Sequence, residues 1–172
     1  HRLPTIERDR IILPAGLLER VERQTIRFAA LSARLRAAGR HLKRGVLLYG
    51  PPGTGKTLTA MYLSTQMRER TVMLIAGQAF QMGLLRPAFA MARALQPATL
   101  VLEDVDLIAE DRSQAACGQP QLYELLDQMD GLHEDADVML LLTTNRPNIL
   151  EPALASRPGR VDLAVEVPLP DA

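Results

Sequence analysis

The sequence predicts an α/β fold in which a five-stranded parallel sheet carries helices on both faces. Five short apolar runs alternate along the chain with segments of helical periodicity. The runs are continuously apolar, as is typical of strands buried on both faces of a parallel sheet. Polar clusters follow three of the runs, and ligands of such sheets bind beyond the carboxyl ends of the strands. We therefore expect a three-layer sandwich with its functional site along that edge.

The elements are expected in a regular order. After an extended start, apolar residues at helical spacing predict a helix from Leu17 to Ala38, which Gly39 ends. Strands are predicted at residues 45–49, 71–76, 99–102, 138–143 and 161–167. Helices between and after them are predicted at residues 58–68, 84–95, 121–129 and 152–156. The polar segment 111–119 is expected to be a mobile loop.

The composition fits one globular domain. The 172 residues are 47% hydrophobic, and 20 Lys and Arg balance 20 Asp and Glu. This neutral charge favours neither a general nucleic-acid surface nor a membrane surface, although it leaves room for a local basic patch. The single cysteine, Cys117, has no partner for an internal disulfide and indicates a reducing, cytoplasmic setting. No apolar run reaches the ~20 residues that cross a membrane, and no signal peptide is visible.

One stretch fits the pattern G-x-x-x-x-G-K-[ST], which is that of a phosphate-binding loop. Its residues are Gly50, Pro51, Pro52, Gly53, Thr54, Gly55, Lys56 and Thr57. Glycines let the backbone approach an anion, so that successive amide groups can cradle phosphates. Lys56 would contact the β- and γ-phosphates, and Thr57 would offer its hydroxyl to Mg²⁺. The predicted strand before the loop and helix after it support this interpretation over an ordinary glycine turn with an incidental lysine.

Polar residues after later strands are candidates for hydrolytic chemistry. Glu103 and Asp104 end the third strand, where one carboxylate would orient Mg²⁺ and the next would polarise an attacking water. Asn145 follows the fourth strand and could hold that water, or it could begin a turn before a proline. Arg157 and Arg160 flank a Pro-Gly turn, and composition alone favours two ordinary surface arginines.

In this order the segments resemble the AAA family of ATPases, within the AAA+ class. The resemblance rests on residues 44–57 for Walker A, 100–106 for Walker B, Met129-Asp130-Gly131, and residues 143–147, 152–154 and 157–162 for the second region of homology. It implies a P-loop NTPase fold, ATP hydrolysis with Mg²⁺ and assembly into homo-oligomeric, usually hexameric, rings. It also gives Asn145 a sensor role and makes Arg157 and Arg160 arginine fingers for a neighbouring subunit's nucleotide. The expected nucleotide-binding set is then Gly50 to Thr57 together with Leu58.

The sequence departs from the family pattern at three places. The Walker B pair reads Glu103-Asp104 where Asp-Glu is usual, so Glu103 would serve the metal and the shorter Asp104 the water, with slow hydrolysis as one consequence. The usual aromatic-hydrophobic-glycine motif after the second strand is reduced, and either Phe80 or Met82 could grip a polypeptide in a ring's pore, or both could be packing residues. A C-terminal helical lid is not expected within residues 1–172, which we interpret as the large α/β subdomain, with 1–44 as an extended segment plus helix.

The leading interpretation is a Mg²⁺-dependent ATPase that remodels or unfolds protein substrates as a ring oligomer. The segments Arg157-Pro158-Gly159-Arg160 and Met129-Asp130-Gly131 favour this branch of the class over clamp loaders and replication initiators. One alternative is a nucleic-acid motor or loader, which the neutral charge does not support. A further alternative is an assembly switch, in which ATP binding with weak hydrolysis locks a state that binds a partner.

Overall fold

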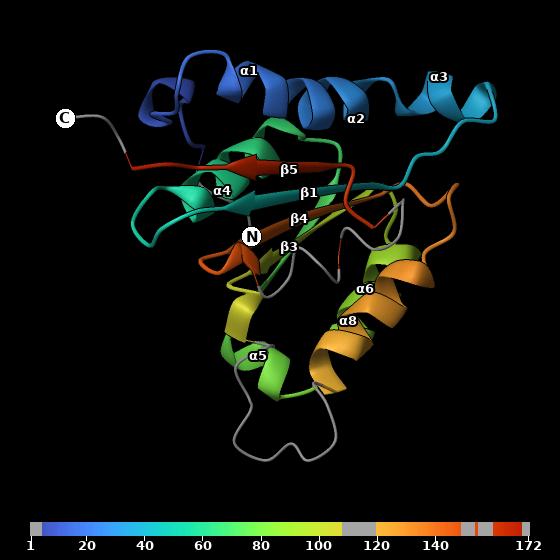
Figure 1. Cartoon of the computed structure of the whole chain (residues 1–172). Coiled ribbons are helices and arrows are strands. Elements are labelled where there is room, and N and C mark those ends of the chain that lie inside the picture. The colour runs from blue at the N-terminus through green and yellow to red at the C-terminus, as the bar shows by residue number, and fades with distance from the viewer. Residues whose placement is uncertain (1–4, 108–119, 149–153, 155–159, 170–172) are drawn as a thin grey trace.

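Five parallel strands form a single sheet in the order β2-β3-β4-β1-β5 (Figure 1). The structure is a computed structural model of the chain, and it describes residues 5–107, 120–148, 154 and 160–169. The strands are β1 (Arg44–Tyr49), β2 (Thr71–Ala76), β3 (Ala98–Glu103), β4 (Val138–Thr144) and β5 (Leu163–Glu166). The predicted parallel sheet is confirmed, and the carboxyl ends of all five strands lie at one edge.

Helices cover both faces of the sheet, as the sequence predicts. On one face lie α5 (Gln78–Gln81), α6 (Leu85–Ala94) and α8 (Pro120–Asp130). On the other lie α4 (Lys56–Gln66) and a segment containing α1 (Leu17–Glu22) and α2 (Phe28–Ala30). The strands feed both layers, because successive side chains alternate between faces: Leu47 joins the first core, whereas Val46 and Leu48 join the second. This is the expected three-layer sandwich.

The N-terminal segment lies along the second face, held by polar contacts as well as by apolar packing. Tyr62 on α4 donates a hydrogen bond to Glu22 (2.6 Å), and Arg8 in the short turn η1 (Arg8–Arg10) pairs with the same glutamate (2.9 Å). The guanidinium of Arg44 lies 4.1 Å from the centre of the Phe28 ring, a cation–π contact. The N-terminal helix is therefore part of the sandwich.

The predicted helix over residues 17–38 is confirmed from Leu17 to Ala30, although it contains a π-helical turn, η2 (Arg23–Arg27), between α1 and α2. It is interrupted at Leu31, before α3 (Ser32–Ala37). Within this stretch the Thr25 hydroxyl bonds to the carbonyl of Val21 (2.8 Å), a local bond that competes with the regular helical pattern. The predicted end is confirmed, because Gly39 has φ +62° and closes the helix.

The two edge strands and one short helix differ from what the sequence predicts. Strand β2 is not buried on both faces, because it is an edge strand with β3 as its one neighbour, and Leu74 is 45% exposed. The short helix α5 was not expected, and it carries Phe80 into the core. Strand β5 is shorter than predicted. The predicted loop 111–119 lies outside the described residues, as does most of the predicted helix 152–156.

A buried ion pair fastens three strands at the amino-terminal edge of the sheet. Arg70, just before β2, pairs with Asp137, just before β4, at 2.6 Å between Nη1 and Oδ1. The same guanidinium donates to the Thr99 hydroxyl (3.1 Å) and the Ala98 carbonyl (2.6 Å) on β3. Both side chains are about 95% buried, at 5% and 4% exposure. One arginine thus ties β2, β3 and β4 together.

No helix among the described residues is long and apolar enough to span a bilayer.

We predict that Arg70→Ala destabilises the chain by about 3–5 kcal/mol, because the substitution leaves the carboxylate of Asp137 buried and uncompensated. Arg36→Ala is the matched control: Arg36 contacts the same carboxylate at 3.5 Å, but its side chain is 61% exposed. That exposed contact is expected to contribute at most about 1 kcal/mol. Urea unfolding of the two variants measures the difference, and equal losses would contradict the structural role given to Arg70.

Candidate functional site

The glycine-rich loop connects β1 to α4 at the carboxyl-terminal edge of the sheet. Gly50 has φ +150°, and a Cβ there would collide with the backbone oxygen of Val167 after β5. Gly55 has φ +87° and caps the amino end of α4, which points the helix dipole into the loop. The predicted strand, loop and helix are therefore confirmed as a unit, and two of its glycines are required by backbone geometry.

Lys56 lies inside this loop and is almost fully buried. Its ammonium donates hydrogen bonds to the carbonyls of Gly50 (2.8 Å) and Pro51 (2.7 Å). Burial lowers the pKa of Lys56, whereas the nearby carboxylates of Asp104 and Asp106 act to raise it. The lysine thus lies within the electrostatic reach of the acidic residues that follow β3, which joins the loop and the acidic cluster into one site.

The residues after β3 are held against the end of β4. The Asp104 amide donates to the Thr143 hydroxyl (3.1 Å), and the Asn145 side-chain amide donates to the Asp104 carboxylate (3.2 Å). Asp104 has φ +50°, a left-handed conformation that few residues other than glycine adopt, although Asp is among the more tolerant. The structure therefore brings Asp104 and Asn145 together, as their positions after neighbouring strands predict.

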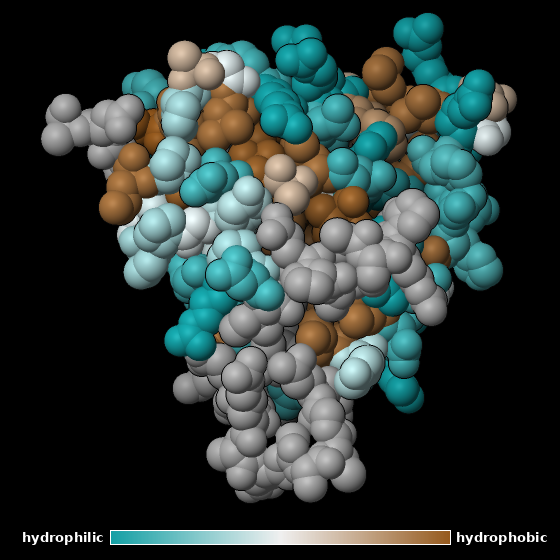
Figure 2. Space-filling model, in the orientation of Figure 1, coloured by the Kyte–Doolittle hydropathy of each residue, from teal (hydrophilic) through white to brown (hydrophobic). Residues whose placement is uncertain are grey.

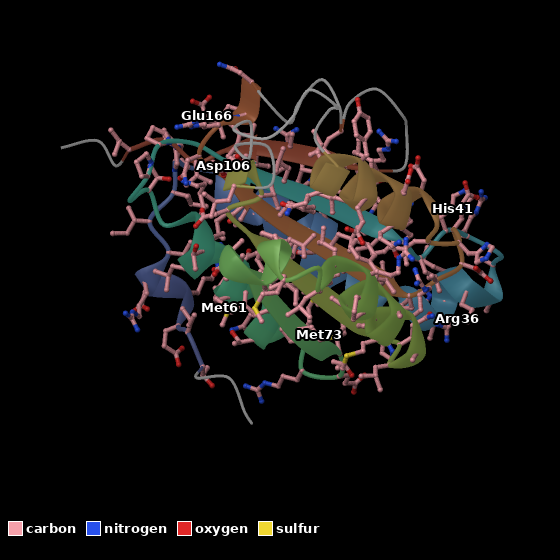
Figure 3. The ribbon with its side chains drawn as sticks, turned by 90° about the horizontal axis from the view of Figure 1, so that it is seen from below. Arg36, His41, Met61, Met73, Asp106 and Glu166 are labelled. Carbon is pink, nitrogen blue, oxygen red and sulfur yellow. The ribbon has the colours of Figure 1, made fainter. Side chains whose placement is uncertain are left out.

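Asp106 contributes to the site in a way that the sequence interpretation did not assign. It is buried, and its Oδ1 accepts hydrogen bonds from the Thr144 hydroxyl (2.9 Å) and the Asn145 backbone amide (3.2 Å). It thereby fixes the turn that carries the Asn145 side chain. Figure 3 shows Asp106 and Glu166 at one end of the molecule and Arg36 and His41 at the other, which marks the site edge of the sheet. A signal was present in the sequence, since Asp106 is a third acid directly after an apolar strand.

The oxygen atoms at this edge would suit a magnesium ion that takes only one or two of its ligands from the protein. Glu103 has a buried Oε1 that accepts no hydrogen bond from any described residue, and Thr57 is exposed at the first turn of α4. No group of three or more metal-ligating side chains occurs among the described residues. Mg²⁺ commonly takes one or two protein oxygens and fills the rest of its shell with phosphate and water. Thr57 and Glu103 therefore suit such an ion, and an all-protein metal centre is not present in the described part.

Arg160 is engaged within its own chain. Its Nε and Nη2 donate to the two carboxylate oxygens of Asp130 at 2.9 and 2.8 Å, and its side chain is 8% exposed. The hydrogen bonds that Arg160 donates to Asp130 raise the pKa of Arg160. Such a bidentate pair fixes the guanidinium, so in this conformation Arg160 braces the chain and does not present its charge to a neighbour. Arg157, the other predicted finger, lies outside the described residues.

The two candidate pore residues differ sharply in exposure. Phe80 is 2% exposed and packs in the core beside α6, whereas Met82 is 74% exposed. Gly83 follows Met82 with φ +69° and turns the chain toward α6. Phe80 is therefore a packing residue in this structure, and Met82 is the one of the pair that a partner could contact.

Comparison with known proteins bears on the family to which the chain belongs. The family model described as "ATPase family associated with various cellular activities (AAA)" matches residues 46–169. The Proteasome-activating nucleotidase of Methanocaldococcus jannaschii is 37% identical over 139 residues, which is 74% of this chain and 32% of that relative. The 26S proteasome regulatory subunit 6B homolog of Dictyostelium discoideum is 41% identical over the same length, which is 74% of this chain and 34% of the relative. The chain thus spans about a third of the length of these curated relatives.

We predict that Gly50→Ala destabilises the chain far more than Gly53→Ala. Both positions have positive φ, which costs a residue with a Cβ about 1–2 kcal/mol. A Cβ at Gly53 meets nothing within 4 Å, whereas at Gly50 it strikes the Val167 backbone and forces β1 and β5 apart. The expected additional loss is at least about 2 kcal/mol, measured by urea unfolding. Similar midpoints for the two variants would contradict this close approach.

Proposed function

Because the chain belongs to the AAA family of ATPases, we propose that it binds ATP with Mg²⁺ at the loop between β1 and α4 and hydrolyses it. One observation carries the proposal: Asp104 and Asn145 are hydrogen-bonded to each other at the edge of the sheet where Lys56 lies. A phosphate-binding loop alone indicates binding. A carboxylate and an amide held beside it supply the groups that can position a nucleophilic water.

Binding is assigned to residues Gly50 to Leu58. The backbone amides of the loop and the amino end of α4 would cradle the phosphates, and the Lys56 ammonium would move from the loop carbonyls to phosphate oxygens. Thr57 and Glu103 would hold Mg²⁺, which neutralises charge on the β- and γ-phosphates during the reaction. Each of these residues lies at the carboxyl edge of the sheet, so the binding assignments are mutually compatible.

Hydrolysis is assigned to Asp104 and Asn145. The Asp104 carboxylate would accept a proton from the water that attacks the γ-phosphorus as the bond to ADP breaks, and the Asn145 side-chain amide would orient that water without adding charge. Thr143 would position Asp104 by accepting a hydrogen bond from its backbone amide. Asp106 would position Asn145 in the same way, through the Asn145 backbone amide. Arg157 stays the proposed finger for a neighbour's nucleotide, and Arg160 would first have to leave Asp130.

The proposed work is the remodelling or unfolding of protein substrates by a ring oligomer. Its support is that the relatives are a proteasome-activating nucleotidase and a proteasome regulatory subunit, and that Met82 is exposed at the end of α5. We treat this chain as the α/β subdomain of such a motor, with residues 1–44 as its N-terminal extension.

A second candidate, the assembly switch with weak hydrolysis, also has a specific observation in its favour. Asp104 is one methylene shorter than the glutamate usual at its position. Its carboxylate already accepts a hydrogen bond from the Asn145 side-chain amide. A carboxylate with short reach and an existing partner would activate water slowly. Turnover by the wild-type protein therefore separates the switch from the motor.

We predict that Asp104→Asn keeps ATP affinity within about threefold and lowers turnover at least about a hundredfold, because it removes the general base and keeps the shape. Asp104→Glu, which keeps the charge, should retain measurable turnover, and Lys56→Ala should lose nucleotide binding. Binding of a fluorescent ATP analogue and steady-state phosphate release measure the two effects separately. Unchanged phosphate release in Asp104→Asn would refute the assignment.

We predict that Met82→Ala lowers the protein-stimulated part of the ATPase rate about fivefold without changing the basal rate, as expected for an exposed contact residue. Met91→Ala, at a methionine that is 52% exposed on α6, is the matched control and should have no effect. Phe80→Ala should instead lower the free energy of unfolding by about 3–5 kcal/mol. Equal stimulation of wild type and Met82→Ala by an unfolded protein would exclude this residue from substrate contact.

A further inference from the structure

The neutral net charge conceals two blocks of opposite sign. Residues 121–137 contain no Lys or Arg and six acids, and residues 23–44 contain no Asp or Glu and seven bases. The bases are Arg23, Arg27, Arg34, Arg36, Arg40, Lys43 and Arg44, and the acids are Glu124, Asp127, Asp130, Glu134, Asp135 and Asp137. Some of these charges pair within the chain, as Arg36 does with Asp137, and the exposed ones that do not are candidates for an external partner.

The basic block, together with Arg20 just before it, presents a row of arginines that we call the basic ridge: Arg20, Arg23, Arg27 and Arg34. All four are exposed, and none forms an ion pair with a described residue, unlike Arg36 and Arg44. From Arg20 to Arg34 the ridge extends ~21 Å at the usual helical rise. Figure 2 shows hydrophilic residues along the upper edge of the molecule, where the N-terminal segment lies.

The acidic block presents a matching surface on α8 and the turn after it, which we call the acidic face: Tyr123, Glu124, Asp127 and Asp135. The three carboxylates form no ion pair with a described residue, whereas Asp130 pairs with Arg160 and Asp137 with Arg70. Tyr123 lies one turn before Asp127 and is 62% exposed. The acidic face therefore combines unpaired negative charge with an exposed aromatic ring, the kind of residue that dominates binding energy at interfaces.

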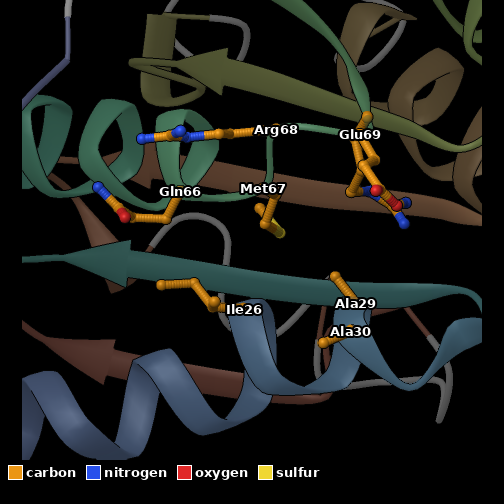
Figure 4. A pocket seen from close by; sticks show the side chains of 8 residues that line it. Ile26, Ala29, Ala30, Gln66, Met67, Arg68 and Glu69 are labelled. Carbon is orange, nitrogen blue, oxygen red and sulfur yellow. The ribbon is translucent and has the colours of Figure 1, made fainter.

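A cavity beside the basic ridge can receive such a ring. It has a volume of about 240 Å³ and lies between the N-terminal segment and the chain that joins α4 to β2 (Figure 4). Its apolar lining comes from Ile26, Ala29, Ala30 and Met67, and its polar lining from Gln66, Arg68, Glu69 and Arg70. The two surfaces thus match in two respects. The arginines of the basic ridge suit the carboxylates of the acidic face, and the cavity suits the Tyr123 ring.

We propose that the basic ridge of one copy of this chain docks on the acidic face of a second copy, with Tyr123 entering the cavity. The N-terminal segment and α8 pack on opposite faces of the sheet, so α1 and α2 do not meet α8 within one chain, and the two blocks touch only farther along, where Arg36 pairs with Asp137 (Figure 1). Pairing of two different surfaces is head-to-tail, and repeated head-to-tail contacts close into a ring or continue as a filament. The inference rests on the proposed ring oligomer, and it names the surfaces that hold the ring together.

A second copy fits the ridge better than a nucleic acid does. The net charge of zero gives the chain no general positive field for binding a nucleic-acid backbone, so only a local patch such as the ridge could do so. The negative charges that neutralise the ridge are present in the chain itself, gathered on the acidic face. An apolar cavity beside the arginines also has no use in a contact made with phosphates alone.

The test uses paired charge reversals and sedimentation velocity with Mg²⁺ and ATP. Arg23→Glu with Arg27→Glu makes the ridge acidic, and Glu124→Lys with Asp127→Lys makes the acidic face basic. Each double variant alone is expected to self-associate at least about tenfold more weakly than wild type, because like charges now face each other. An equimolar mixture of the two is expected to recover the wild-type complex, because every contact between unlike variants again pairs opposite charges.

Tyr123→Ala tests the cavity contact and is expected to weaken association about tenfold. Arg86→Glu with Arg93→Glu on α6 makes the same change in net charge away from the ridge and should associate as wild type does. If a reversal fails to fold, as judged by urea unfolding, Arg23→Gln with Arg27→Gln takes its place and should still weaken association.

The proposed surfaces are wrong if the mixture of folded variants stays dissociated, or if either double variant associates like wild type. They are also wrong if the ridge variants lose binding to a DNA duplex while self-association is unchanged, which would identify a nucleic-acid surface. Binding of a fluorescent ATP analogue is measured on the same samples. Loss of that binding in wild type would refute the proposed ATPase, whereas the mixing result bears on the docking surfaces alone.

Discussion

The buried ion pair between Arg70 and Asp137 is the constraint on which the rest of the structure depends. It joins the chain before β2 to the chain before β4, and the same guanidinium bonds to β3 between them. This contact supports the strand register in which Leu102 lies beside Leu142. Just beyond that pair, the same register places the end of β3 beside Thr143, so that the Asp104 amide meets the Thr143 hydroxyl. An interaction at one edge of the sheet thereby supports the geometry of the chemistry at the other edge.

A second constraint is the close approach of β5 to β1. Gly45 lies against the backbone of Arg160 and Gly50 against that of Val167, so neither position has room for a side chain. Strand β5 consequently fixes β1 at both of its ends, and the loop begins from a strand that cannot shift sideways. The cradle for phosphates is preorganised by these backbone contacts, which a glycine at each position makes possible.

Much of this could be predicted from the sequence, because it depends on local pattern. The apolar runs identified the five strands, and the glycine-lysine motif located the loop. Features that depend on distant partners could not be predicted. Arg160 was expected to face a neighbouring subunit, but Asp130, thirty positions earlier in the chain, holds it by two hydrogen bonds. The exposure of β2 follows from the strand order, which no run of residues encodes, and its Val, Leu and Ile content is that of a central strand. Asp106 was visible as an acid, but its bonds to Thr144 and Asn145 required the fold.

The left-handed backbone of Asp104 has a consequence for how this site can change over time. At φ +50° the short Asp side chain is tolerated better than Glu, which cannot bond as readily to its own backbone. The order Glu103-Asp104 therefore suits the backbone at each position. Glu103, with the longer side chain, lies in the extended strand, and Asp104, with the shorter one, lies in the turn. A mutational route from this pair to the reversed order must pass through Glu at the strained position or through two Asp residues in succession. The chain is thus held at its present pair by backbone geometry as well as by chemistry.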